Sequence, residues 1–174
     1  MNEFSILMNL LSNRISKNQI GATKQELMEA LNLRKDKDAY YFQELLSQLS
    51  NYIEPLGLYV RFNPVDHHWF ISHDFKTSNL LSANPFQDKP KLAATLFCVL
   101  VACLKSSGSA KVKDIKELRK KKGVLRDLKK LEEEGYILLD DEEKQVILTP
   151  LIGYQLDIQK LFVKLSLKLK EEKE

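Results

Sequence analysis

The sequence has little of the material from which active sites are built. Its 174 residues include only six glycines, and neither a G-x-x-x-x-G-K-[ST] phosphate loop nor a G-x-S-x-G nucleophile elbow occurs. The carboxylates are scattered along polar stretches, with no apolar pocket beside them to shift a pKa. We therefore expect a protein that catalyses no reaction and holds no cofactor.

The histidines and cysteines do not form a metal-binding pattern. His67, His68 and His73 are the three histidines. A zinc site needs four ligands in a tetrahedron, and adjacent residues on a strand point to opposite faces. Cys98 and Cys103 lie in an apolar stretch with helical spacing, where a disulfide between them would distort the helix. We expect no metal, and two apolar thiols in a reducing cytoplasm.

Long apolar runs are also missing. No run of roughly 18 apolar residues is present, which is the length needed to span a bilayer, and no signal peptide opens the chain. The sequence therefore predicts neither membrane insertion nor secretion, and a cytoplasmic location. The apolar content of 44% and charged content of 29% are typical of globular proteins.

The main positive feature is an order of elements that occurs twice. In the first copy, Thr23 and Glu26 form a capping-box pattern that starts a short helix. Apolar residues at helical spacing predict one helix before it and another after it, and Pro55 and Gly57 end the last one. Two segments rich in aromatic and β-branched residues, 58–62 and 69–71, then flank a turn and predict a hairpin.

The second copy repeats this order. Residues 91–104 predict an apolar helix, and two short amphipathic helices follow around 112–118 and 124–131. Gly135 is placed to end the last of them, and the segments 136–139 and 145–148 predict a second hairpin. Three helices followed by a hairpin is the winged-helix order, so we predict an α+β, mostly helical fold of two tandem winged-helix domains with a C-terminal tail helix.

We predict four parts: a first winged-helix domain over residues 1–75, a linker over 76–90, a second winged-helix domain over 91–150 and an amphipathic tail over 151–174. The tail has apolar residues at helical spacing, although residues 163–170 also alternate apolar and polar as a strand would. The tail and the first helix, with Phe4, Leu7 and Leu11, hold more apolar surface than such small domains easily bury. We therefore expect protein contacts at both ends of the chain, including a two-fold dimer through the first domain.

The charges are unevenly distributed. Residues 1–75 carry 7 Lys and Arg against 9 Asp and Glu, whereas residues 105–134 carry 11 against 6. Lys120, Lys121, Lys122 and Arg126 lie at the start of the last helix of the second copy, where they could meet nucleic-acid phosphates. The turn of the second hairpin, residues 140–143, holds four consecutive acids and would oppose such binding.

Three stretches resemble the segregation and condensation protein B family, of the kite group of kleisin-interacting tandem winged-helix proteins. They are residues 57–72, residues 91–96 and the series Asp114–Arg119, Gly123–Leu128 and Glu134–Ile137. The sequence departs from the family at Lys120–Lys122, which stand in a shortened turn where the family usually has a glycine after the arginine.

The resemblance implies an architectural function. Proteins of this family form homodimers through the first domain and bind the central region of a kleisin subunit, which bridges the heads of an SMC ATPase in chromosome condensation and segregation. On this basis we expect a nucleoid-associated protein whose partner-binding residues are Leu92, Leu96, Ile158, Leu161, Phe162 and Leu165 and whose dimer interface contains Phe4, Leu7 and Leu11. Weak, sequence-indifferent contact with DNA is a further expectation.

The alternative hypothesis is that the protein is a tandem winged-helix transcriptional regulator that binds a specific DNA sequence. The salt dependence and sequence preference of any DNA affinity discriminate between the two, because a regulator prefers its site by at least roughly a thousandfold.

Overall fold

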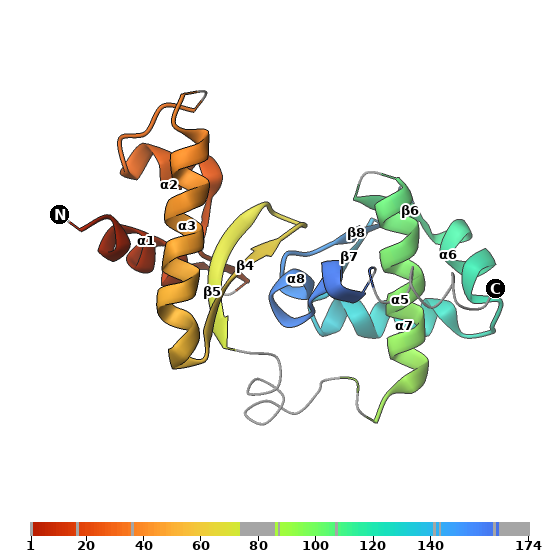
Figure 1. The fold of residues 1–174 in the computed structure, drawn as a ribbon. Coiled ribbons are helices and arrows are strands. Elements are labelled where there is room, and N and C mark those ends of the chain that lie inside the picture. Colours follow the sequence, from red (N-terminus) through yellow and green to blue (C-terminus); the bar gives the residue numbers. More distant parts are fainter. Residues whose placement is uncertain are drawn as a thin grey trace, which may run out of the picture.

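The computed structural model describes residues 2–16, 18–35, 37–73, 86, 88–106, 108–140, 142, 144–161 and 163. Within these ranges the chain forms two similar units of helices followed by a small antiparallel sheet, which is the tandem winged-helix arrangement (Figure 1). None of the described helices is long and apolar enough to cross a membrane.

The first unit, here called module one, contains three helices. They are α1 (Glu3–Ser12), α2 (Lys24–Ala30) and α3 (Ala39–Ile53), followed by a 3-10 turn at Glu54–Leu56. The predicted capping box starts α2, because Thr23 accepts from the backbone N–H of Glu26 and the Glu26 carboxylate accepts from that of Thr23. Gly57, with φ 71°, ends the turn in the left-handed conformation.

The sheet of module one has three strands in the order β3-β5-β4. These are β3 (Ala22–Thr23), β4 (Leu58–Asn63) and β5 (His68–His73), and a separate two-stranded pair, β1 (Arg14–Ser16) and β2 (Gln19–Ile20), follows α1. The hairpin was predicted from sequence, whereas β1, β2 and β3 were not. A strand of two or three residues is too short for an alternating pattern, and β3 exists only through its pairing with β5.

The second unit, module two, repeats this topology. Its helices are α5 (Pro90–Lys105), α6 (Val112–Arg119) and α7 (Val124–Glu133), and its sheet has the order β6-β8-β7. The strands are β6 (Ser109–Lys111), β7 (Ile137–Asp140) and β8 (Gln145–Leu148). Gly135 has φ 84° and follows α7, as predicted. Cys103 is buried and Cys98 is half-buried, and both are free thiols.

Each module has its own group of buried apolar residues. Leu7, Leu11, Phe42 and Leu49 belong to the first group, and Leu96, Ile115 and Leu128 belong to the second. A short helix, α8 (Leu151–Gln155), follows the second sheet, and residues 158–161 are again helical. The described part of the tail thus consists of two short helical pieces separated by an extended Leu156, whereas the alternating segment 164–170 lies outside the described residues.

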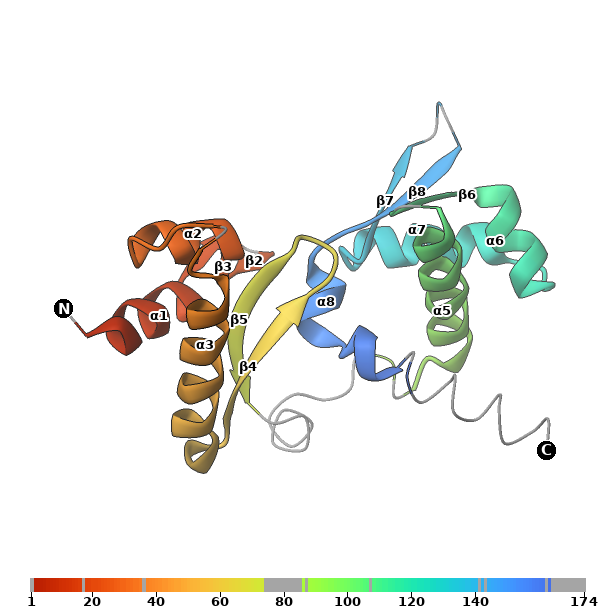
Figure 2. The same cartoon turned by 45° about the horizontal axis from the view of Figure 1, so that its top comes forward.

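The β4–β5 hairpin lies between α3 and module two, and α8 lies against it in both views (Figures 1 and 2). The two modules are therefore in direct contact, and the contact is built from α8 on one side and the hairpin with its turn on the other. This arrangement fixes where the candidate surfaces of the two modules lie with respect to each other.

Candidate interaction surfaces

The contact between the modules centres on Tyr154 of α8. Its hydroxyl oxygen lies 2.6 Å from Asp66 Oδ2 and 2.9 Å from the Ile20 carbonyl oxygen, so both acceptors are within hydrogen-bond distance of its one hydrogen. Burial, and then the bond to Asp66, raise the pKa of Tyr154 to about 12. Its ring also packs edge-on against Phe70, with ring centroids 4.9 Å apart.

Asn63 makes a second link between the modules. It is fully buried, donates from Nδ2 to the Pro150 carbonyl oxygen at 3.0 Å and accepts from the backbone N–H of Val65 at 3.0 Å. Gly153 lies directly opposite, and a Cβ there would fall 1.7 Å from Asn63 Oδ1. Only glycine at this position lets α8 approach the hairpin so closely.

α8 is bound to its own module as well. The Tyr136 hydroxyl donates to Gln155 Oε1 at 2.7 Å, and Ile152 is buried in the core of module two. Beyond α8, Asp157 lies 3.9 Å from the Arg61 guanidinium of β4. The start of the tail, which was predicted to face a partner, therefore joins the two modules of the same chain.

The predicted partner-binding residues of module two are mostly internal. Leu92, Leu96 and Ile158 are buried in its core, and Leu161 is half-buried against the same core. Phe162 and Leu165 lie outside the residues whose side chains the structure describes. Periodicity marked these leucines as one apolar face, but it does not say whether that face is covered by the same chain.

The apolar surface that module two does expose is on its sheet. Leu138 of β7 and Ile147 of β8 are directly opposite each other and are 56% and 41% exposed. Leu104, at the end of α5, is 51% exposed. Figure 2 shows the β7–β8 hairpin extending beyond the helices of its module. An exposed pair of large aliphatic residues on an open sheet face is a surface that another chain can cover.

A groove of about 580 Å³ connects this surface to module one. Its lining includes Pro64, Val65 and His67 from the turn of the first hairpin and Leu100, Leu104, Ile147, Leu148 and Ile158 from module two. Most of the residues that line the groove are aliphatic, and Gly108, Ser109 and Gln145 complete the lining. We call Leu104, Leu138 and Ile147 together with this groove the sheet surface.

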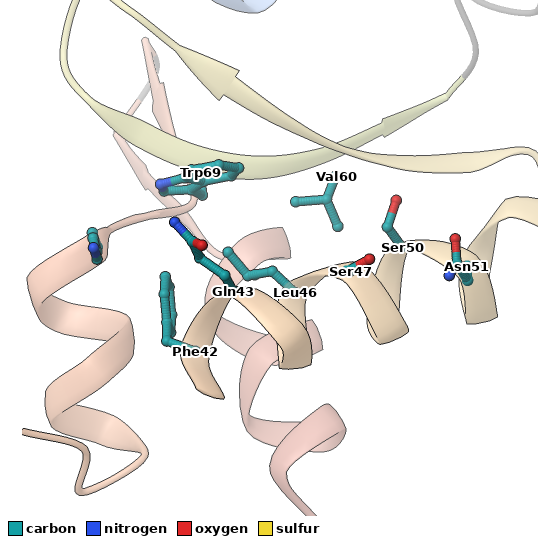
Figure 3. Close-up of a pocket in the computed structure, with 9 residues that line it drawn as sticks. Phe42, Gln43, Leu46, Ser47, Ser50, Asn51, Val60 and Trp69 are labelled. Atoms are coloured by element: carbon teal, nitrogen blue, oxygen red, sulfur yellow. The ribbon is translucent and has the colours of Figure 1, made fainter. Parts of the chain in front are cut away.

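Module one has its own hollow, of about 410 Å³, between α3 and the hairpin. In Figure 3, Trp69 and Val60 of the hairpin face Phe42, Gln43 and Leu46 of α3, and Ser47, Ser50 and Asn51 continue along the helix. Lys24 is its single ionisable lining residue. A hollow with one lysine and no acid or nucleophile partner offers binding contacts but no acid–base pair.

The three histidines do not converge on one point. His68 is buried, with Nδ1 3.0 Å from the Asp66 carbonyl oxygen and Nε2 3.3 Å from Gln19 Nε2, while His67 and His73 are exposed. Among the described residues, no group of three His, Cys, Asp or Glu side chains is placed to hold a metal ion. His68 instead holds the turn that carries Asp66.

The residues predicted for the dimer interface divide into two kinds. Leu7 and Leu11 have no exposed surface and belong to the core of module one, whereas Phe4 is half-buried, with its ring centroid 6.1 Å from that of Tyr52. Tyr52 and Leu56 are 70% and 68% exposed and line a hollow of about 630 Å³ with Phe4 and Met8. Of the three predicted residues, Phe4 is therefore the one with exposed surface, next to Tyr52 and Leu56.

The predicted nucleic-acid contacts are all on the surface. Lys120, Lys121 and Lys122 form the turn between α6 and α7, and Arg126 is exposed on the first turn of α7. Arg119, a neighbour of these cations in the sequence, has a structural role instead. Its Nε donates to Thr95 Oγ1 at 3.3 Å, and that hydroxyl donates to Asp127 Oδ2 at 2.8 Å, so the three residues connect α5, α6 and α7.

No protein-family model matches the sequence, and no curated protein matches it. Solved structures that resemble the fold include the following two. ScpB from Mycobacterium tuberculosis is 14% identical, with a TM-score of 0.33 over 84% of this chain and 88% of that one. A conserved hypothetical protein from Chlorobium tepidum is 12% identical, with a TM-score of 0.36 over 83% of this chain and 88% of that one.

The first of these structures belongs to the family that the sequence motifs resemble.

Proposed function

We propose that this protein is a non-catalytic architectural subunit that binds the kleisin of an SMC complex and acts in chromosome condensation and segregation. Two features support this assignment. The sequence resembles the segregation and condensation protein B family in Asp114–Arg119, Gly123–Leu128 and Glu134–Ile137, and the chain folds as two winged-helix modules of the same topology.

The observation that carries the proposal is the sheet surface of module two. Leu104, Leu138 and Ile147 expose large aliphatic side chains beside a groove lined by both modules. Binding energy between proteins is concentrated in a few apolar anchors that become fully buried, and a helix or an extended segment can supply them. A central kleisin segment with apolar residues fits such a groove.

The tail is the second part of the proposed kleisin contact. Leu161 is half-buried at the edge of the core, and Phe162 and Leu165 are predicted to extend the apolar contact beyond it. Leu92, Leu96 and Ile158 contribute by holding the core of module two, on which the contact is built.

Module one is proposed to bind a second copy of the chain. Phe4, Tyr52 and Leu56 form its exposed apolar surface, and an isologous dimer would bury two such surfaces at once. In this proposal the chain is divided into residues 1–75 for self-association, a linker over 76–90, residues 91–150 for partner binding and a tail over 151–174.

The direct test is affinity purification of the tagged full-length protein from its native cells, with the co-eluting proteins identified by mass spectrometry. The proposal predicts stoichiometric kleisin and SMC subunits in the eluate. The matched control is the same protein with Ile147→Asp, which is expected to lose both. Elution without kleisin or SMC from cells that express them would contradict the proposal.

A DNA-binding regulator is the second candidate, and the exposed cations of α7 favour it. Against it, Asp140 and Glu142 lie at the second hairpin turn, where they repel phosphates. A regulator predicts a preference for one sequence of at least roughly a thousandfold, retained at physiological salt.

A further inference from the structure

The exposed side of α7 carries a set of cations that extends beyond those predicted from sequence. Arg126, Lys129 and Lys130 are exposed on the helix, and Lys121 and Lys122 are exposed in the turn before it. Lys91, at the start of α5, is exposed beside them. We call these six residues the basic face. Four of them, with Lys89, line a hollow of about 630 Å³ between the start of α5 and α7.

None of these six cations forms an ion pair within the described part of the chain. The ion pairs among the described residues of module two join Lys89 to Glu134 and Lys113 to Glu117, and none of these pairs involves the basic face. Three carboxylates, those of Asp88, Asp127 and Glu133, also line the hollow, and Asp127 accepts from Thr95. They are fewer than the cations, and Glu132 on the same helix accepts from the backbone N–H of Leu139. The basic face therefore presents net positive charge to solvent.

The position of the basic face suits a nucleic-acid duplex. α7 is the third helix of a winged-helix module, and the corresponding helix of helix-turn-helix proteins lies along the major groove. Lys129 and Lys130 follow Arg126 by three and four residues within α7, so the three side chains share one side of the helix about one turn apart.

We infer that the basic face binds the phosphate backbone of double-stranded DNA without sequence preference. This goes beyond the proposed kleisin contact and uses different residues. The side chains are lysines with a single arginine, which contact phosphates but read few base edges. Glu142 at the hairpin turn adds repulsion and keeps the affinity low.

A membrane surface is the less suitable polyanion. Helices that lie on membranes combine cations with an outward apolar face that enters the lipid. The apolar side of α7, with Val124, Leu128 and Leu131, is buried in the core of module two instead. On the exposed side of α7, Leu125 is the only large apolar residue.

The test is fluorescence anisotropy of the full-length protein with two duplexes of unrelated sequence, at about 50 to about 200 mM salt. The triple variant Arg126→Ala, Lys129→Ala, Lys130→Ala is expected to bind at least about tenfold more weakly, with a salt slope smaller by about one for each phosphate that is no longer neutralised. The matched control, Lys35→Ala, Lys37→Ala, Lys113→Ala, removes the same charge elsewhere and is expected to bind like wild type.

A variant that should bind DNA more tightly provides a second test. Glu142→Lys replaces an anion by a cation at the turn of the second hairpin and is expected to strengthen binding to both duplexes. Equal losses in the triple variant and its control would overturn the inference, as would a strong preference for one duplex. Binding to anionic lipid vesicles with none to either duplex would also overturn it. The triple variant is expected to keep its kleisin affinity, which separates this inference from the proposed function.

Discussion

Tyr154 and Asp66, 88 positions apart in the chain, form a hydrogen bond of 2.6 Å that joins module two to the first hairpin. The acceptor is a carboxylate, and bonds to charged acceptors are stronger than those between neutral groups. Together with the Asn63–Pro150 bond, this contact holds the two modules in one relative orientation. The groove of the sheet surface depends on that orientation, because residues of both modules line it.

Removing the Tyr154 hydroxyl should weaken the contact between the modules. Tyr154→Phe removes the shortest hydrogen bond to the Asp66 carboxylate, which keeps only the backbone N–H and ring of His68 beside it. We therefore expect a loss of about 1 to 3 kcal/mol in the free energy of unfolding. Urea denaturation measures this loss, and small-angle scattering should show a larger radius of gyration. The control is Tyr40→Phe, the same change at an exposed tyrosine outside the proposed dimer surface. If both variants unfold like wild type, the hydrogen bond does not hold the modules together.

Adding one methyl group at Gly153 should have a similar effect through steric conflict. Gly153→Ala places Cβ against Asn63, and we expect a destabilisation of about 1 to 3 kcal/mol from overpacking. Because both residues share this contact, the double variant with Asn63→Ala should lose less than the sum of the two single losses. Strict additivity in denaturation experiments would show that Gly153 and Asn63 do not meet.

The capping box of α2 should make stability depend on pH in the acid range. Hydrogen bonds from the Thr23 backbone and side chain hold the pKa of Glu26 below its usual value of 4.5. A lowered pKa in the folded state contributes stability above the unfolded pKa, and this contribution is lost as the pH falls through the lowered value. Glu26→Ala should therefore be less stable than wild type at neutral pH, and the difference should shrink in acid.

Denaturation at a series of pH values measures this difference, with Glu133→Ala as an exposed control. Thr23→Ala should cost about 1 kcal/mol through loss of the same cap. A difference between wild type and Glu26→Ala that stays constant from neutral to acid pH would contradict the assignment.

Self-association should depend on Phe4 but not on the basic face. We expect wild type to be a dimer by light scattering at about 50 µM, well above the dissociation constant of a micromolar dimer. Phe4→Glu places a charge on the exposed apolar surface with Tyr52 and Leu56 and should give a monomer. A monomeric wild type, or a dimeric Phe4→Glu variant that is correctly folded, would exclude this interface.

The sequence predicted most of the local structure because local signals determine it. The capping box of Thr23 and Glu26, the left-handed Gly57 and Gly135, and both hairpins are each specified within a few neighbouring residues. The strands β3 and β6 were missed, because two or three residues carry no periodicity and become strands only by pairing with β5 and β8.

The candidate surfaces were harder to predict than the fold. An apolar side of a helix looks the same in sequence whether its own chain or another chain covers it. Leu7, Leu11, Leu92 and Leu96 were therefore assigned to interfaces, although the structure places them in cores. The contact of Tyr154 with Asp66 and Ile20 could not be predicted from the sequence either, because the contacting atoms are brought together only by the packing of two modules.

The central claim is that module two binds a kleisin, and calorimetric titration tests it most directly. A peptide of the kleisin's central region, from the same genome, is titrated into wild type, Ile147→Asp and Phe162→Asp, with circular dichroism to confirm folding. Leu118→Asp, at an exposed leucine of α6, is the matched control. We predict that wild type and the control bind equally, and that each of the other variants binds at least about thirtyfold more weakly, which corresponds to about 2 kcal/mol. Binding to no kleisin segment by folded wild type would contradict the claim.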